Sequence, residues 1–460
     1  MSILKVTLKP GNNVLTSYFP ARTGNNEGDF DWGVAKAVVV RNLYRKQLNA
    51  KFSKNLSGEP GNKESSAINA FRKICRTDFE ERLDETKLWE YLDEMYFSDE
   101  AIYDVAPEAL LFKLAPLTGN SPQHRLADMF SSLMRGLYID KPVEEDCNFL
   151  EQQVVKSLRS DEVLSDFNGG RKTLSKGVNE KAYLPFLTER FRSDLQFLAS
   201  HPKHLIDQLE NLLKLYGYLY TAQLALNIKG LDCEPTAKPL YFIMENETAS
   251  RERTDLVRKG HQTVSRLLVN IFPYLSMSEG LQEVSREDNE HRLPLWKLAQ
   301  SLTENDSNKL RDYAEEFAKN RNESLLFNFP YDKDNTEPRY WLDALLELAV
   351  KQFDKGTTRS AAQSKFVKAT EDELCSTFVK ARGQVGKVLV MNQDYIALIT
   401  NIAIGSKDKL RFHELLTEFN SRGIYFDKQS QQALIRFYER VGNVERMSDS
   451  GEAVYVRKIL

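Results

Sequence analysis

Cysteine is scarce in this chain, and the cysteines that are present lie far apart. The 460 residues contain only Cys75, Cys147, Cys233 and Cys375. This spacing provides neither the close pairs of a zinc site nor the framework of a disulfide-rich secreted domain. A reducing compartment, the cytoplasm, is therefore the expected location.

Long apolar runs and an excess of positive charge are also missing. No stretch approaches the roughly twenty apolar residues that a membrane-spanning helix needs. Residues 1–8 alternate apolar and polar side chains, unlike the apolar core of a signal peptide. The formal net charge is −3, which argues against a strongly basic protein that coats nucleic acid by itself. We expect a soluble protein with no membrane partner.

What remains is the composition of an ordinary globular protein, with 41% hydrophobic and 28% charged residues. The length allows two or three cores at about 150 residues each. Breaks at Ser165–Gly177 and Lys355–Gln363 divide the chain. The predicted regions are a mainly helical N-terminal region 1–170, a central helical region 171–355 and a C-terminal region 356–460.

Apolar residues recur mostly at helical spacing, which predicts a mainly α fold with a large multi-helix body. Arg258–Leu275, for example, is predicted to be helical. Two segments depart from this pattern. Ile3–Leu8 alternates and predicts a short N-terminal strand. Pro239–Met244 is an apolar run rich in β-forming residues that predicts a second strand or an extended segment.

The C-terminal region carries the most specific pattern. Three short amphipathic helices are predicted near residues 392–405, 412–421 and 428–441. Asp427 is a good N-cap for the third, because its carboxylate can accept from free N–H groups of the first turn. Val444–Met447 and Ala453–Arg457 then predict two strands joined by a turn at Ser448–Gly451. Three helices followed by a hairpin are the plan of a winged helix-turn-helix domain.

The polar face of the third predicted helix is a candidate binding surface. Gln432, Arg436 and Arg440 are four residues apart and form one row, and such side chains read base edges or hold phosphates. The full candidate set is Lys428, Gln429, Gln432, Arg436, Arg440, Arg446 and Arg457. Residues 389–460 hold ten lysines and arginines against nine aspartates and glutamates. Protein docking and a purely structural role therefore remain alternatives to DNA contact.

Two patterns invite a comparison with known ligand sites but fit poorly. Gly383, Gly386 and Lys387 lack the spacing and the following Ser or Thr of a phosphate-binding loop, and a flexible turn between helices is predicted there. His201 and His204 have no third ligand nearby in the sequence, so a surface pair at a helix start is predicted. No metal, cofactor or catalytic residue is assigned.

Acidic and basic residues follow the predicted strand at 239–244, namely Glu245, Glu247, Arg251 and Arg253. Carboxylates at a strand end can hold Mg²⁺ in nucleases, but the lysine of one common nuclease pattern is missing. A salt-bridged surface or an interface is preferred. Arg251 and Arg253 are the candidates for holding a partner carboxylate or a phosphate.

Tyr216, Tyr218 and Tyr220 could stack bases, but aromatic residues among leucines at helical spacing are predicted to be core.

Several segments together resemble the DptG (DndG) family. They are Phe378–Leu389, Ser421–Asp427, Ser448–Val456, and Pro239–Glu245 followed by Ser250–Arg253. The motif most specific to that family is Ser448-Asp449-Ser450-Gly451 with the following Ala453, Tyr455 and Val456. The resemblance is clearest over about the last hundred residues.

The resemblance implies a subunit of the bacterial DNA phosphorothioation-dependent restriction system, an anti-phage defence that attacks DNA lacking the sulfur modification. It also implies two partners, DptF-like and DptH-like subunits with ATPase or helicase-like motifs. The expected function is a non-catalytic subunit that bridges these partners and positions DNA or a partner through the winged helix. The alternative is a metal-dependent DNA nuclease subunit whose carboxylates assemble from distant segments.

Overall fold

The computed structural model describes residues 3–11, 19–21, 30–56, 63–80, 86–117, 123–139, 147–167, 180–282, 292–321, 330–446 and 454–459. Helices dominate these residues, which confirms the mainly α prediction. No helix among them is both long and apolar enough to cross a membrane. The chain forms two compact units: an N-terminal unit of residues 27–176 and 191–213, and a C-terminal unit of residues 1–26, 177–190 and 214–460.

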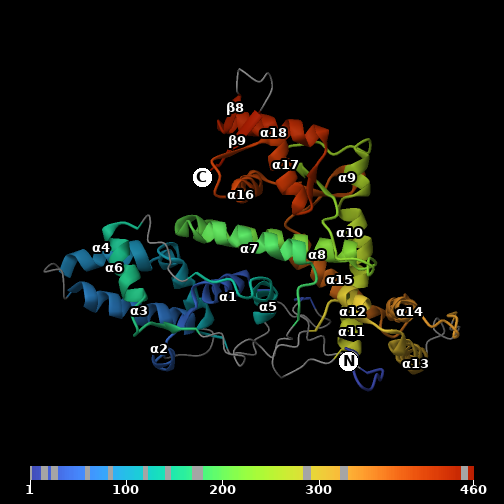
Figure 1. Cartoon of the computed structure of the whole chain (residues 1–460). Coiled ribbons are helices and arrows are strands. Elements are labelled where there is room, and N and C mark those ends of the chain that lie inside the picture. Colours follow the sequence, from blue (N-terminus) through green and yellow to red (C-terminus); the bar gives the residue numbers. More distant parts are fainter. Residues whose placement is uncertain are drawn as a thin grey trace. The chain divides into compact units, whose positions relative to one another are not determined.

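The N-terminal unit is built mainly from helices (Figure 1). Its elements are α1 (Trp32–Tyr44), β1 (Lys46–Leu48), α2 (Ala50–Lys54), α3 (Lys63–Glu80), α4 (Thr86–Phe97), η2 (Ala101–Asp104), η3 (Pro107–Leu114), α5 (His124–Leu133), α6 (Phe149–Leu158) and β2 (Leu164–Asp166), with parts of α7 (Pro185–Ala199) and α8 (Pro202–Asn227). Phe112 of η3 lies near Phe52 and Phe71, with ring centroids 6.3 and 5.4 Å away. The apolar face of α1 packs against η3 and α5.

The C-terminal unit combines helices with two small sheets (Figure 1). Besides the remaining parts of α7 and α8, its elements are β3 (Leu240–Met244), α9 (Thr254–Arg258), α10 (His261–Leu267), η4 (Leu268–Asn270), α11 (Ile271–Leu281), α12 (Leu295–Ser301), α13 (Glu304–Arg321), α14 (Pro338–Lys351), α15 (Ser360–Thr370), η5 (Glu371–Cys375), β4 (Val379–Ala381), η6 (Gly383–Val385), β5 (Lys387–Met391), α16 (Gln393–Ile404), β6 (Lys409–Arg411), α17 (Phe412–Ser421), β7 (Ile424–Phe426), α18 (Lys428–Val441), β8 (Val444–Arg446) and β9 (Val454–Arg457).

The first sheet has the strand order β4-β5-β3-β7. The central strand β3 runs parallel to both β5 and β7, with Phe242 opposite Leu389 and Phe426. Tyr218 of α8 packs on the same strand, 6.0 Å from the Phe242 ring and 5.3 Å from that of Phe378. The predicted strand at 239–244 is thus confirmed. The prediction of a core role is also confirmed for Tyr216, Tyr218 and Tyr220, which are all fully buried.

The second sheet has the order β6-β9-β8, and both pairs are antiparallel. Val456 of β9 lies opposite Leu410 of β6 on one side and Val444 of β8 on the other. The predicted pairing of the last two strands is confirmed, while the predicted turn at Ser448–Gly451 lies outside the described residues. The three predicted helices correspond to α16, α17 and α18.

The predicted N-terminal strand is wrong, because residues 3–8 join no sheet among the described strands. The backbone N–H of Lys5 donates to the carbonyl of Leu281 at 3.0 Å, and its ammonium group donates to the carbonyl of Glu279 at 2.8 Å. Leu4 is buried, whereas Val6 is 88% exposed. The alternation reflects one buried side chain beside the end of α11, not strand pairing.

The predicted helix at 258–275 is broken into α10, η4 and α11 after the short α9. A side chain at Gly260 would overlap the carbonyl oxygen of Leu256, so the chain turns there without a Cβ. The carbonyl of Lys259 instead accepts from the N–H of Tyr241 at 3.1 Å. A tertiary hydrogen bond to β3 therefore interrupts the local helical pattern.

The predicted interhelix turn around Gly383 is instead the turn of the β4–β5 hairpin. The N–H of Arg382 donates to the carbonyl of Gly386 at 2.8 Å, and both glycines have positive φ angles, +51° and +87°. The predicted boundary at residue 355 also differs from the observed units. It cannot separate two compact domains, because β3 lies between two strands that follow residue 355.

Candidate nucleic-acid interface

Helix α18 exposes the polar face predicted from the sequence. The Asp427 carboxylate accepts from the N–H of Ser430 at 2.9 Å and caps the helix. Leu434 and Phe437 are buried against the rest of the unit. The predicted binding residues of this helix are all exposed, namely Lys428, Gln429, Gln432, Arg436 and Arg440. We call these five residues the α18 face.

The start of α18 is tied to the loop after β3 by Arg253. Its Nε and Nη2 donate to the two carboxylate oxygens of Asp427 at 2.7 and 2.6 Å. Its Nη1 donates to the Glu247 carboxylate at 3.1 Å, and Nη2 also contacts the Ser430 hydroxyl at 2.6 Å. The Ser430 hydroxyl lies 2.9 Å from the same Glu247 carboxylate. We call Glu247, Arg253, Asp427 and Ser430 the anchor network.

The position of Arg253 corrects the prediction that it contacts a partner. The residue is 8% exposed, and its guanidinium donates to two carboxylates, the Ser430 hydroxyl and the carbonyl of Thr248. A bidentate guanidinium–carboxylate pair of this kind has a defined geometry. Arg253 therefore sets the position and direction of α18 and is not available to an outside ligand.

The pKa shifts in the anchor network keep both partners charged. Burial opposes ionisation of Asp427, but hydrogen bonds from Arg253 and Ser430 outweigh it and hold the pKa of this carboxyl below its ordinary value. Burial likewise lowers the pKa of Arg253, but Asp427 and Glu247 together raise it above its ordinary value. The network is an ion pair at neutral pH, and such a pair fixes one geometry more than it adds stability.

The two arginines predicted on the hairpin are exposed but paired. Arg446 forms an ion pair with Glu439 of α18, and Arg457 forms one with Glu445 of β8. Lys409 of β6 pairs with the same Glu445. Within the described ranges, Lys428 and Arg436 of α18 form no ion pair, whereas Arg446 and Arg457 of the hairpin each form one.

Arg251, the second predicted partner contact, is exposed at the β4–β5 hairpin. Its Nη2 and Nε donate to the carbonyl of Gln384 at 3.0 and 3.3 Å. In return, Nη2 of Arg382 donates to the carbonyl of Glu245 at 2.6 Å. These reciprocal contacts hold the hairpin turn on the loop after β3, and a partner-binding role for Arg251 stays a prediction.

The carboxylates considered for a nuclease are not arranged around a free centre. Glu245 is exposed, whereas Glu247 accepts from Arg253, Ser430 and the N–H of Met244, the last at 2.7 Å. The carboxylate of Asp427 is likewise occupied by the anchor network. Across the part of the chain that the structure describes, no three His, Cys, Asp or Glu side chains are placed to hold a metal ion.

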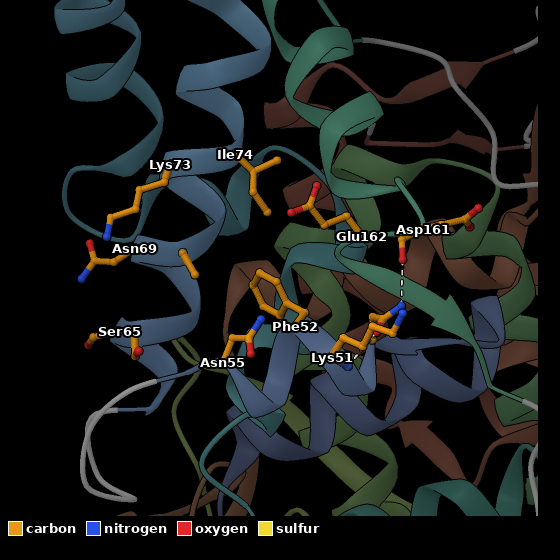
Figure 2. Close-up of a pocket in the computed structure, with 12 residues that line it drawn as sticks. Lys51, Phe52, Asn55, Ser65, Asn69, Lys73, Ile74, Asp161 and Glu162 are labelled. Atoms are coloured by element: carbon orange, nitrogen blue, oxygen red, sulfur yellow. Dashed lines mark hydrogen bonds between the residues drawn. The ribbon is translucent and has the colours of Figure 1, made fainter.

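A hollow of about 1040 Å³ with a mixed polar and apolar lining lies in the N-terminal unit (Figure 2). None of the predicted binding residues lines it. Ser65, Asn69 and Lys73 of α3 line one side, and Asp161 and Glu162 lie on the other. Its remaining lining residues are Asn49, Lys51, Phe52, Asn55, Ser66, Ala70 and Ile74. Lysines and carboxylates face the same space, so the charges select no single class of ligand.

Two features of the site were missed by sequence reasoning. Asp427 was identified as a helix cap, but its partner Arg253 lies 174 residues earlier, and no local spacing shows that pairing. No pattern in the sequence singles out Ser430.

A scan of protein-family models and a search of curated proteins give no match to this chain.

Proposed function

We propose that this protein is a non-catalytic subunit of a DNA phosphorothioation-dependent restriction complex and that it contacts duplex DNA through the α18 face. The observation that carries the proposal is the exposed row of Gln432, Arg436 and Arg440 on a helix whose start is fixed by the anchor network. A rigidly held helix with glutamine and arginine on its outer face can enter a major groove.

The arrangement of the last elements supports a winged helix. The order is α16, β6, α17, α18, β8, β9, and β6 pairs with β9 beside β8. In a winged helix, the last two strands form the wing and the helix before them is the recognition helix. Here that helix is α18. An additional strand, β7, lies between α17 and α18 and pairs with β3 of the first sheet. The winged-helix elements are therefore joined to the rest of the C-terminal unit through this sheet.

The family resemblance supports the same region. Its described segments are Phe378–Leu389, Ser421–Asp427, Pro239–Glu245 and Ser250–Arg253, which supply β4 and β5, β7, β3 and the anchor arginine. Segments far apart in the sequence therefore meet in one sheet and in the anchor network beside α18. Under this proposal, the DptF-like and DptH-like partners supply the ATP-driven steps.

The test measures binding of the purified full-length chain to a labelled DNA duplex by fluorescence anisotropy over a range of salt concentrations. Arg436→Ala with Arg440→Ala should weaken binding and reduce the slope of log affinity against log salt by about 2, at about 1 for each lost phosphate contact. The matched control is Lys365→Ala with Lys368→Ala on α15, which removes the same charge from two exposed positions.

Equal slopes for the two double variants would overturn the DNA contact. A pull-down of the partner subunits with and without nuclease treatment then separates two roles. If the Arg436 and Arg440 variant loses partners even after nuclease treatment, the α18 face binds protein and not DNA. If both DNA and partners are retained, α18 is not the working surface.

A further inference from the structure

Helix α4 of the N-terminal unit carries two apolar stripes, and only one of them is buried. The buried stripe consists of Trp89, Leu92 and Tyr96. The second stripe has Leu88, Tyr91 and Met95 at positions i, i+3 and i+7, next to the first around the helix. Tyr91 is 67% exposed and Met95 is 55% exposed. An amphipathic surface helix normally has polar residues there.

A fourth large apolar residue of the same unit is also exposed. Phe149, the first residue of α6, is 69% exposed. The preceding Asn148 lies 3.5 Å from the Tyr96 hydroxyl, which places the start of α6 beside α4. Among the described residues of this unit, the only other exposed large apolar side chain is Tyr138, at 40%, and the Arg45 guanidinium lies 3.4 Å from its ring centroid. We call Leu88, Tyr91 and Met95 the α4 patch.

Acidic side chains border the patch. Glu90 and Glu94 are four residues apart on α4 and exposed, and Asp99 and Glu100 follow the helix and are exposed as well. Within the described part of the chain, Glu90, Glu94 and Asp99 form no ion pair, and Glu100 lies 3.7 Å from Lys113. Lys87 is the only basic residue in the sequence of α4, so negative charge exceeds positive charge along the rim of the patch.

We propose that the α4 patch is the docking site for a basic amphipathic helix of a partner protein. The spacing of Leu88, Tyr91 and Met95 matches the i, i+3, i+7 anchors by which two helices pack. Tyrosine and methionine are enriched at the centres of protein interfaces. The 12 residues of α4 present a length of roughly 18 Å, which suits about three turns of a partner helix.

The acidic residues beside the patch favour a partner helix that carries basic residues. Lysines or arginines beside the apolar stripe of the partner would meet Glu90 and Glu94, which favours encounter and fixes the register of the two helices. A second copy of this chain would bring two acidic rims together, and duplex DNA would meet carboxylates, so like charges disfavour both.

The test uses the full-length chain and a fluorescein-labelled synthetic helix with leucines on one face and lysines along its flanks. A matched peptide carries glutamates in place of the lysines. The lysine peptide should bind and the glutamate peptide should not. Tyr91→Ser with Met95→Ser should weaken binding by about tenfold or more, because both anchors are lost. Val441→Ser, another exposed apolar position outside this unit, should leave the affinity unchanged.

A charge reversal tests the rim independently. Glu90→Lys with Glu94→Lys should transfer the preference from the lysine peptide to the glutamate peptide. This second variant also carries the test if the serine variant loses its helical circular dichroism.

No binding by the full chain, equal binding of the two peptides, or unchanged affinity in the folded serine variant would overturn the proposal. Self-association in sedimentation velocity that disappears in the serine variant would overturn it in favour of a second copy. Arg436→Ala with Arg440→Ala should retain peptide binding, so this proposal and the DNA contact of α18 can fail separately.

Discussion

At the scale of single residues, Arg253 holds together groups that would otherwise repel each other. Its guanidinium lies between the carboxylates of Glu247 and Asp427, and the side chains of Arg253 and Glu247 are only 6% and 7% exposed. Replacing it by methionine leaves two neighbouring carboxylates without their positively charged partner. We predict that Arg253→Met lowers the free energy of unfolding by about 3 kcal/mol, measured by urea denaturation, because breaking one side of a buried pair is costly.

The neighbouring arginine provides the matched control. Arg251 is exposed and donates only to the backbone carbonyl of Gln384 among the contacts described. Arg251→Met should therefore cost no more than about 1 kcal/mol, the usual net value of one hydrogen bond. Equal losses for the two variants would mean that the carboxylate pair contributes nothing beyond an ordinary hydrogen bond, and that α18 is held by its apolar face alone.

At the scale of elements, the link from α17 to α18 depends on a glycine. Gly423 has a φ angle of +83°, and a Cβ there would overlap the side-chain amide of Gln223 and lie 3.2 Å from the carbonyl oxygen of Lys238. That amide makes two hydrogen bonds to the backbone of Lys238, at 2.7 and 2.9 Å. We predict that Gly423→Ala destabilises the unit by about 3 kcal/mol, from backbone strain and two disturbed hydrogen bonds.

A substitution at Gly442 separates the effect of backbone strain from the effect of the disturbed hydrogen bonds. It ends α18 with a φ angle of +81°, but a Cβ there would meet nothing within 4 Å. Gly442→Ala should therefore show the backbone strain alone, about 1 kcal/mol. Thermal unfolding of both variants measures the difference. A loss at Gly423 no larger than that at Gly442 would show that Gln223 can move aside without cost.

Helix α18 could be predicted from the sequence, whereas several of the short strands could not. Periodicity, the Asp427 cap and Gly442 are local signals, and they predicted the helix from Lys428 to Val441 and its exposed face. The strands β4, β6 and β7 have three residues each, too few for a reliable alternation, and β7 pairs with β3, which is far away in the sequence. The same distance hid the pairing of Arg253 with Asp427, so a buried anchor was predicted as an exposed contact.

At the scale of the whole molecule, the C-terminal unit cannot be divided where the composition changes. Both neighbours of β3 come from the region after residue 355, and Phe242 and Ile243 of β3 are fully buried. A chain ending at residue 355 therefore loses both neighbours of a central strand. We predict that it binds a hydrophobic dye strongly and loses the cooperative unfolding of this unit, because a paired and covered strand becomes an exposed apolar edge.

A chain ending at Gly442 is the control for the chain ending at residue 355. It lacks β8 and β9 but keeps all four strands of the β4-β5-β3-β7 sheet and the anchor network, so cooperative unfolding of that sheet should persist. Hydrogen exchange at the N–H of Leu240, which donates to the carbonyl of Gly423 at 3.0 Å, reports on the pairing directly. If the chain ending at 355 unfolds as cooperatively as this one, β3 does not need its neighbours and the boundary is real. If it does not, loss of DNA binding after that truncation would reflect unfolding, and only substitutions on the exposed face of α18 can separate recognition from stability.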